Sequence, residues 1–597
     1  MNEPIAPDRD ARPLFSSRPG RRAVAWTKPA RSNRQRAAME TSLMNPATVR
    51  CSIALLLCLL LPAGCKSPFH SHPDDYGPRI PLERIQTVQR LPIEEYTREE
   101  APEDDPAALQ RGQTRFEGLD SFDISLEQVR AWTLENNLDL RIALINPEIA
   151  NQAVTEEEAR FESVFTAGVR RTETQQPTAL QTVGSEVDTT NVDFGLEIPM
   201  RTGGRIDLAL PINETATNNP FATLDPSLTV RPSVSITQPL LRNAGRRSNT
   251  HGIRVASIQA GIEQARTKLE VIRQIAAADR AYWRLYAARR ALDVRVQQYD
   301  LAVAQLERAR RRVRAGQDAD IEIIRAEAGV AERIEAIILS ENDVLLQQRS
   351  LKRIINAPDL GMDTHVLLAT ISDPDPLPYL FDPTALTKLA MDNRMEMLEL
   401  ELQLAIDSSS IDFQRNQALP LFVMDFTYRL SGLGQNVSQA SRQVRDVDFQ
   451  DWSLGLSAEI PIGNEAAKAR VARAVLTRLQ RLSTLDARRL AITQETLDAL
   501  DQIDAGWRRI IAARQSAILA GRTLEAEQRQ FDVGMRTSTD VLDAATRLAD
   551  AQLAEIRALA EYQIAQIDLA FATGTLLGAA RVDWTPLDPR GEQKVDY

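Results

Sequence analysis

The sequence predicts an α+β membrane protein in which long antiparallel coiled-coil helices are combined with a few membrane-length β-strands per chain. Three observations predict this class. Two stretches, about 247–313 and 465–531, read as continuous helices without a proline. Short runs on the N-terminal side of each stretch alternate apolar and polar residues, which is the pattern of a strand with two different faces. Both patterns occur twice in the same order, so the chain contains an internal duplication.

Composition excludes several classes of protein. The 597-residue chain is 43% hydrophobic and 26% charged, with a net charge of −11. These values exclude a polytopic helical membrane protein and a wholly disordered chain, and the acidic balance argues against nucleic acid as a partner. All three cysteines lie between positions 51 and 65, and the four histidines form no H-x-x-x-H pair. We therefore expect no metal, no cofactor and no enzymatic activity.

Residues 1–64 read as a signal peptide. An eleven-residue apolar run, 51–61, is too short to cross a bilayer as a helix. The run ends in Leu-Pro-Ala-Gly-Cys, which resembles a bacterial lipobox and predicts that Cys65 is lipidated. An ordinary signal peptide with an incidental cysteine is the alternative. The unpatterned residues at the extreme N-terminus suggest that translation starts at Met39 or Met44.

The remainder divides into a tether and two repeats. Seven prolines and many acidic residues between 65 and 120 predict an extended, lipid-anchored tether. We assign the first repeat to 121–357, a linker to 358–380, the second repeat to 381–580 and a C-terminal tail to 581–597.

Two pairs of matching segments define the duplication. Residues 133–140 match 390–397 at an offset of 257, and residues 315–326 match 533–544 at an offset of 218. The offsets differ by 39 residues, so the first repeat carries about one extra hairpin. This hairpin falls near 190–212, where it either joins the barrel or forms an outer loop.

The predicted strands are long enough to cross a bilayer. Their lengths of about 9–11 residues are those of a tilted transmembrane strand. The apolar positions alternate with polar ones, and in the second repeat they are Phe422, Met424, Phe426, Tyr428, Leu430, Trp452, Leu454, Leu456, Ala458 and Ile460. In the first repeat they are Phe194, Leu196, Ile198, Val234 and Ile236.

Each long helix would extend over roughly 100 Å, too far for one globular domain to bury. A heptad seam predicts coiled-coil packing instead. In the first repeat it comprises Leu285, Leu292, Val296, Tyr299, Val303, Leu306 and Val313. Its counterparts in the second repeat are Ile503, Ile510, Leu524 and Phe531. Tight turns at Gly316 and Gly534 then lead into returning helices, about 319–357 and 538–577.

Each repeat also begins with a helical pattern, about 124–160 and 382–417. Pro147 falls inside the first pattern, while Leu404 stands at the matching place in the second. Because proline removes a helical hydrogen bond, we expect a kink or break at Pro147.

Barrel closure forces oligomerisation. Lipid cannot satisfy the open edge of a sheet, so a transmembrane sheet must close. One chain supplies about four core strands, whereas eight is roughly the minimum for a transmembrane barrel. Several chains must therefore share one barrel, and their long helices would continue it as a second tube.

The chain resembles the outer-membrane efflux protein family, the TolC-like channels. The resemblance rests on 125–127, 136–140 and 539–544 together with the Gly316 and Gly534 turns, and it covers about 121–580. It implies a homotrimer with a twelve-strand barrel over a tunnel of twelve helical strands. It also implies a periplasmic adaptor (membrane fusion) protein and an inner-membrane pump as partners. Many members carry a lipidated N-terminal cysteine, as Cys65 would be.

Two carboxylates are candidates for the pore constriction. Glu307 and Glu525 each stand nine residues before a tip glycine. In three chains they would place up to six acidic groups near the periplasmic end, which would favour cations. Solvated outward-facing charges are the alternative, more so for Glu307. Four neighbouring arginines could instead lock the iris through pairs between helices; they are Arg308, Arg310, Arg311 and Arg312.

The helical tips and three aromatic residues complete the candidate site. In similar channels the tips meet the adaptor; here they comprise Arg314, Gly316, Gln317, Gly534, Met535 and Arg536. A plain helix turn is the alternative. Trp452, Tyr428 and Phe426 are expected in an aromatic girdle at the lipid boundary, or otherwise in a core.

These expectations favour a passive exit duct of a tripartite efflux or secretion system in the bacterial outer membrane. The competing function is a periplasmic coiled-coil adaptor or structural lipoprotein whose strands form a soluble domain. Such an adaptor has no need for apolar residues at every second position of membrane-length strands.

Overall fold

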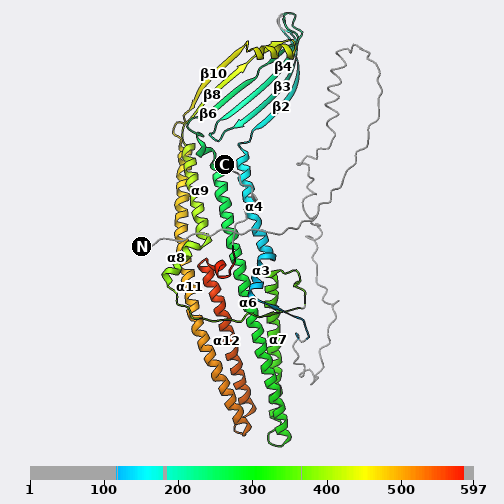
Figure 1. Cartoon of the computed structure of the whole chain (residues 1–597), viewed down its shortest axis with the longest axis vertical. Coiled ribbons are helices and arrows are strands. Elements are labelled where there is room, and N and C mark those ends of the chain that lie inside the picture. The colour runs from blue at the N-terminus through cyan, green and yellow to red at the C-terminus, as the bar shows by residue number, and fades with distance from the viewer. Residues whose placement is uncertain (1–115, 117, 179–183, 365, 584–597) are drawn as a thin grey trace, which may run out of the picture. The chain divides into compact units, whose positions relative to one another are not determined.

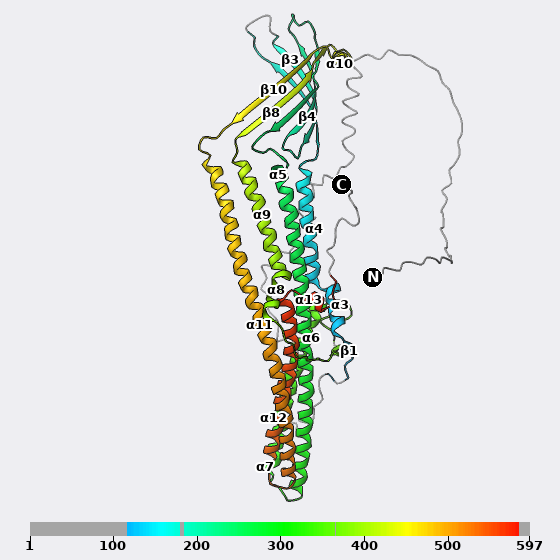
Figure 2. The ribbon, with the colours of Figure 1, turned by 60° about the vertical axis from the view of Figure 1, so that its left-hand side comes forward.

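The computed structural model describes residues 116, 118–178, 184–364 and 366–583, all within one compact unit that begins at Pro102. The predicted signal peptide, Cys65, nearly all of the tether and the last part of the tail lie outside the described residues. In the described part, a sheet stands at one end of a bundle of long helices, and the helical hairpins end at the other (Figures 1 and 2).

The two repeats share one plan, which is a pair of helices, then strands, then a long helix and a returning helix. The first contains β1 (Ser121–Ile124), α3 (Leu126–Asn136), α4 (Leu138–Ala159), β2 (Val164–Gln175), β3 (Glu186–Pro199), β4 (Arg205–Thr217), β5 (Ser227–Val230), β6 (Ser233–Pro239), α5 (Arg246–Asn249), α6 (His251–Arg314) and α7 (Ile321–Ile355). The second contains α8 (Pro383–Asn393), α9 (Met395–Gln417), β8 (Leu421–Leu430), β9 (Gly432–Gly434), α10 (Val437–Asp446), β10 (Gln450–Glu459), α11 (Glu465–Asp532), α12 (Ser538–Ala572) and α13 (Leu576–Ala579). The predicted linker contains β7 (Leu367–Thr370), which pairs in parallel with β1.

The main sheet has the spatial order β10-β8-β6-β4-β3-β2, and each neighbouring pair is antiparallel. Figure 1 shows β2 at one edge and β10 at the other. The extra hairpin of the first repeat is β3–β4, and it lies in the sheet between β2 and β6 rather than outside it. The hairpin is thus part of the sheet, while its place in a barrel stays a prediction.

The long helices lie where the sequence predicts them. α6 has 64 residues and α11 has 68, and each turns back into a 35-residue helix, α7 or α12. The seam positions on α11, Ile503, Ile510, Leu524 and Phe531, are all buried. They pack against α12 in two clusters, whose members include Tyr562 and Val541. The helical hairpins are thus held by burial of the seam.

The expected break at Pro147 is wrong. α4 runs through Pro147, and the break falls at Asn137 between α3 and α4. Proline deprives the Ala143 carbonyl of its usual i+4 N–H donor. The Thr267 hydroxyl of α6 lies 3.0 Å from that carbonyl oxygen and 2.8 Å from the Glu263 carbonyl, so it shares its one hydrogen between the two and partly replaces the missing donor.

The helix break at Asn137 has a counterpart in the second repeat. Asn137 and Arg394 occupy matching positions, and each separates two helices of its repeat. The Asn137 amide donates to the Ile354 carbonyl at 2.8 Å, and Arg394 donates to the Ala572 carbonyl at 3.4 Å. These carbonyls stand at the C-terminal ends of α7 and α12, so different side chains satisfy equivalent helix ends.

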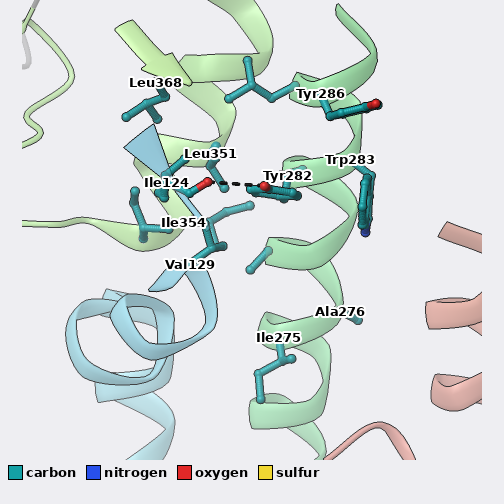
Figure 3. Packing of buried hydrophobic residues seen from close by; sticks show 14 of the residues in the cluster. Ile124, Val129, Ile275, Ala276, Tyr282, Trp283, Tyr286, Leu351, Ile354 and Leu368 are labelled. Atoms are coloured by element: carbon teal, nitrogen blue, oxygen red, sulfur yellow. Dashed lines mark hydrogen bonds between the residues drawn. The ribbon is translucent and has the colours of Figure 1, made fainter. Parts of the chain in front are cut away.

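The largest hydrophobic cluster lies about halfway along α6. Figure 3 shows Tyr282 pointing toward Ile124, and the tyrosine hydroxyl donates to the Ile124 carbonyl at 3.3 Å. Leu351 of α7 and Leu368 of β7 are also fully buried in this cluster. The cluster therefore joins the long hairpin to the β1–β7 ribbon at mid-height.

Candidate pore wall and helical tips

One face of the sheet is apolar across all six long strands. Direct cross-strand partners form an unbroken row that comprises Phe165, Leu196, Leu208, Val234, Tyr428 and Trp452. Phe165 is 66% exposed and Trp452 69% exposed. In water, so large an exposed apolar face is unfavourable. It fits a lipid environment, where apolar surface has no cost.

The opposite face is polar. Glu197 on β3 faces Asp207 on β4, which faces Ser235 on β6. The Ser235 hydroxyl is hydrogen-bonded to the Thr427 hydroxyl of β8 at 3.0 Å. Further along, the Asp425 carboxylate occupies the space that a side chain at Gly455 would need. This face can therefore line a wet interior with a predominance of carboxylates.

The three predicted girdle residues share the apolar face. Trp452 is the cross-strand partner of Tyr428, and Phe426 is the partner of Leu454. The Tyr428 hydroxyl donates to the Gln450 side chain at 2.8 Å. An aromatic body with a polar end suits the boundary between lipid and water. The girdle role itself stays a prediction.

The helical tips have the predicted turn geometry. Gly316 and Gly534 have φ values of +71° and +76°, which side chains other than glycine rarely adopt. The Gly316 N–H donates to the Val313 carbonyl, and the Gly534 N–H donates to the Phe531 carbonyl, both at 2.9 Å. The other candidate tip residues are exposed; they are Arg314, Gln317, Met535 and Arg536. They lie where an axial partner could reach them.

The two candidate constriction carboxylates differ in their surroundings. Glu525 is 72% exposed, and its nearest cation, Arg529, is 3.9 Å away. Glu307 is half-buried and lies 3.0 Å from Arg310, which also binds Glu327 at 3.0 Å. Glu525 is thus available to a pore or a partner, whereas the charge of Glu307 is largely compensated within its own hairpin.

Among the four arginines near the first tip, Arg312 connects the two hairpins. Its guanidinium donates to the Phe531 carbonyl at 2.9 Å and lies 4.7 Å from the centre of the Phe531 ring. It also pairs with Asp318 at 2.8 Å. Arg308 and Arg311 are exposed. The fold thus shows which of the four arginines contacts the second hairpin, while a lock of the iris stays a prediction.

Three further contacts join the hairpins above Arg312. Gln305 of α6 lies 3.3 Å from the Ser538 hydroxyl of α12, and Gln298 donates to the Ala545 carbonyl at 3.1 Å. Arg333 of α7 donates to the Thr546 hydroxyl at 2.6 Å. These contacts are polar, but the hairpins also meet through apolar side chains. Val294 of α6 clusters with Ala549 and Leu553 of α12, and Leu301 of α6 packs against the cluster that contains Leu524 and Val541.

A buried ion pair escaped the sequence analysis. Asp279 of α6 is fully buried and accepts two hydrogen bonds from Arg130 of α3, from Nε at 2.9 Å and Nη2 at 2.8 Å. Burial raises the pKa of Asp279, and the Arg130 charge opposes that rise. The two residues are 149 positions apart, so no local pattern could have paired them.

No group of histidine, cysteine or acidic residues suited to a metal ion occurs among the described residues. In the same part of the chain, no helix combines the length and the apolar character needed to cross a membrane.

Two-faced strands set on paired helical hairpins are the architecture that this chain shares with solved outer-membrane channels. Residues 386–575 match the sequence model of the family described as Outer membrane efflux protein. This match lies in the second repeat, and the family that the chain resembles is one of channels rather than enzymes.

Individual relatives agree. Outer membrane protein TolC of Vibrio cholerae serotype O1 is 24% identical over 324 residues, which cover 53% of this chain and 70% of that protein. Outer membrane protein TolC of Escherichia coli K12 is 26% identical over 197 residues, which cover 32% of this chain and 40% of that protein. The solved Campylobacter jejuni CmeC outer membrane channel has a TM-score of 0.55 at 14% identity, over 76% of this chain and 86% of that channel. This last likeness concerns the fold alone.

Proposed function

We propose that three copies of this chain form a passive outer-membrane exit channel of a tripartite efflux or secretion system. A single observation carries the proposal. One chain holds an open sheet with an apolar and a polar face, and its edge strands β2 and β10 run in opposite directions. Such a sheet cannot stand alone in lipid, because its edges would leave backbone groups unpaired.

The direction of the edges supports closure by identical copies. The six-strand path alternates in direction at every step, so β10 of one chain would meet β2 of the next in antiparallel fashion. This pairing is the one that transmembrane barrels use. The apolar faces would then form a continuous outer band, and the polar faces would enclose water.

The opposite end fits a periplasmic partner. The first tip carries exposed Arg308, Arg311 and Arg314, whereas the second carries exposed Glu525, Asp532 and Arg536. A periplasmic adaptor would therefore meet a basic tip and a mixed tip on each chain, and charge complementarity would set its register. An inner-membrane pump would supply the energy, and Cys65 would anchor the chain to lipid.

The channel and its constriction can be tested in one experiment. Purified protein is reconstituted into a planar bilayer, and single-channel conductance and cation selectivity are measured for wild type and Glu525→Ala. We expect a conducting trimer whose cation preference falls in the variant, because a ring of carboxylates concentrates cations.

Asp498→Ala is the matched control. Asp498 is an exposed acid of the same helix, and at 100° per residue it lies on the opposite face of α11 from Glu525. Its removal should leave selectivity unchanged. Equal selectivity of wild type and Glu525→Ala would remove Glu525 from the pore. Absence of conductance, with the protein monomeric in water, would favour the adaptor or structural lipoprotein.

A further inference from the structure

We infer that the shared barrel has eighteen strands, six from each of three chains, and that the β3–β4 hairpin widens its lumen. This inference rests on the proposed trimer and concerns the size and lining of its pore. The resemblance to TolC-like channels implied twelve strands, four from each chain. The structure places two more strands in the wall of every chain.

The eight strands of the main sheet form six continuous strands, because β5 continues into β6 and β8 continues into β9. Val230 of β5 faces Ile212 of β4, and Ser233 of β6 faces Ala209, three positions further along both strands. The register is therefore unbroken between β5 and β6, and the ladder is interrupted only near Pro232, which has no N–H to donate. β9 continues β8 in the same way, because both keep one register against β5 and β6.

The hairpin has the two faces of a barrel wall. On β3 the apolar positions are Val192, Phe194, Leu196 and Ile198, and on β4 they are Ile206, Leu208, Leu210 and Ile212. The intervening positions carry Asp193 and Glu197 on β3 and Arg205 and Asp207 on β4. β3 and β4 have 14 and 13 residues, which is sufficient to cross a bilayer. An outer loop in water would not need this pattern.

The turn of the hairpin is fixed to the rim of the sheet. The Gly245 N–H donates to the Thr202 carbonyl at 3.0 Å, and the Thr202 hydroxyl lies 3.1 Å from the Gln238 side chain. Gly203 has a φ of +92°, and a side chain there would overlap the Asn243 carbonyl. These contacts hold β3 and β4 in register with β6, so the hairpin cannot leave the wall without breaking them.

The number of strands sets the width of the pore. With strands about 4.8 Å apart and tilted by about 40°, eighteen strands enclose a cylinder roughly 36 Å across between backbones, against roughly 24 Å for twelve. The hairpin also adds three carboxylates and one arginine per chain to the polar face; they are Asp193, Glu197, Asp207 and Arg205. The outer part of the duct would thus be wide and acidic, suited to bulky or cationic cargo.

Cysteine pairs distinguish the two barrels, because no native cysteine follows Cys65. In an eighteen-strand barrel, Phe165→Cys/Leu196→Cys and Leu208→Cys/Val234→Cys join directly opposite positions. Opposite residues of antiparallel strands are within reach of a disulfide. Phe165→Cys/Val234→Cys, separated by two strands and about 14 Å, should not form one. A twelve-strand barrel would bring β2 beside β6 and form only the last pair.

The pairs are oxidised in native outer membranes, and the disulfides are identified by mass spectrometry in a fraction whose subunit number is measured by native mass spectrometry. The first two bridges in a trimer support the inference. The third bridge in a trimer overturns it but leaves the proposed function standing. A monomer or dimer overturns both.

A second measurement concerns the lining. In reconstituted channels, a water-soluble charged thiol reagent should reduce the current of Glu197→Cys and leave that of Leu208→Cys unchanged. Reaction at Leu208→Cys with none at Glu197→Cys would reverse the assigned faces and overturn the inference. The cation preference should also fall in Asp193→Asn/Glu197→Gln, and an unchanged preference would remove the hairpin from the lumen.

Discussion

At the residue scale, the core of the helical body contains a buried ion pair that would be costly to break. Asp279 is fully buried, and Arg130, which binds it through two nitrogens, is largely covered. Such a pair contributes little net free energy compared with an apolar pair of the same shape. Loss of one partner, however, leaves an uncompensated charge in a poorly solvated place.

We expect Asp279→Ala to lower the free energy of unfolding by about 3–5 kcal/mol, because Arg130 is left without its partner. The melting temperature of the detergent-solubilised protein, followed by circular dichroism, measures the effect. Asp504→Ala is the control, since it breaks the exposed pair with Arg508 and should cost less than about 1 kcal/mol. Equal losses in the two variants would contradict the assigned burial.

His251 makes stability depend on pH. Its ring stacks on Phe413 at 4.6 Å between centroids, and Nδ1 lies 3.0 Å from the Ser409 hydroxyl. Burial lowers the pKa of His251, the Arg254 charge lowers it further, and Glu157 opposes them. The folded state therefore binds fewer protons than the unfolded state between the two pKa values.

It follows that the contribution of His251 is intact above the unfolded pKa of about 6.5 and is lost as the pH falls toward the lower pKa of the folded state. We expect the melting temperature to drop on acidification below that point. This group lowers the free energy of unfolding by at most about 1.4 kcal/mol per pH unit. His251→Gln should flatten this part of the profile. Superimposable profiles for wild type and variant would contradict the prediction.

At the element scale, helix ends and helix defects are satisfied by residues from other helices. Pro147 leaves the Ala143 carbonyl without its helical donor, and Thr267 of α6 supplies another. Asn137 and Arg394 serve the ends of α7 and α12 in a comparable way. A helix that looks interrupted in the sequence can thus stay continuous, because a neighbour repairs it.

We expect Thr267→Val to destabilise the protein by about 1–3 kcal/mol, because it leaves a buried carbonyl unpaired. Adding Pro147→Ala should recover most of the loss, since alanine restores the N–H donor within α4. Thr267→Ser retains the hydroxyl and is the control. The melting temperatures of the four proteins form a double-mutant cycle, and strictly additive effects would exclude the repair.

At the scale of the whole molecule, each hairpin is held by an apolar seam, and the two hairpins meet through apolar contacts between α6 and α12 as well as through Arg312 and a few polar contacts. Among the polar contacts between the hairpins, that of Arg312 lies nearest to the tips.

We expect Arg312→Ala to raise the conductance of reconstituted channels, because it removes the bond to the Phe531 carbonyl and the contact with the Phe531 ring. Single-channel recording measures this. Arg308→Ala is the control, an exposed arginine on the same helix. If Arg312→Ala conducts like wild type while its thermal stability is also unchanged, Arg312 does not hold the hairpins together.

The sequence alone determined what repeats locally. The seam of Ile503, Ile510, Leu524 and Phe531, the turns at Gly316 and Gly534, and the two-faced strands all follow from periodicity and from the conformational freedom of glycine. Each is decided by neighbours within a few residues, so a single sequence is enough. The duplication followed from the same patterns, because the two copies share their order.

Only the tertiary structure decided which distant groups meet. It placed the β3–β4 hairpin within the sheet, moved the helix break from Pro147 to Asn137, paired Asp279 with Arg130 and showed that Arg312 is the one of four neighbouring arginines that contacts Phe531. Apart from the hairpin, whose neighbours β2 and β6 are close in sequence, these outcomes depend on residues more than a hundred positions apart, whose contact is set by the packing of whole elements. The physical reason is that hydrogen bonds and ion pairs act over a few ångströms in space, whatever their separation along the chain.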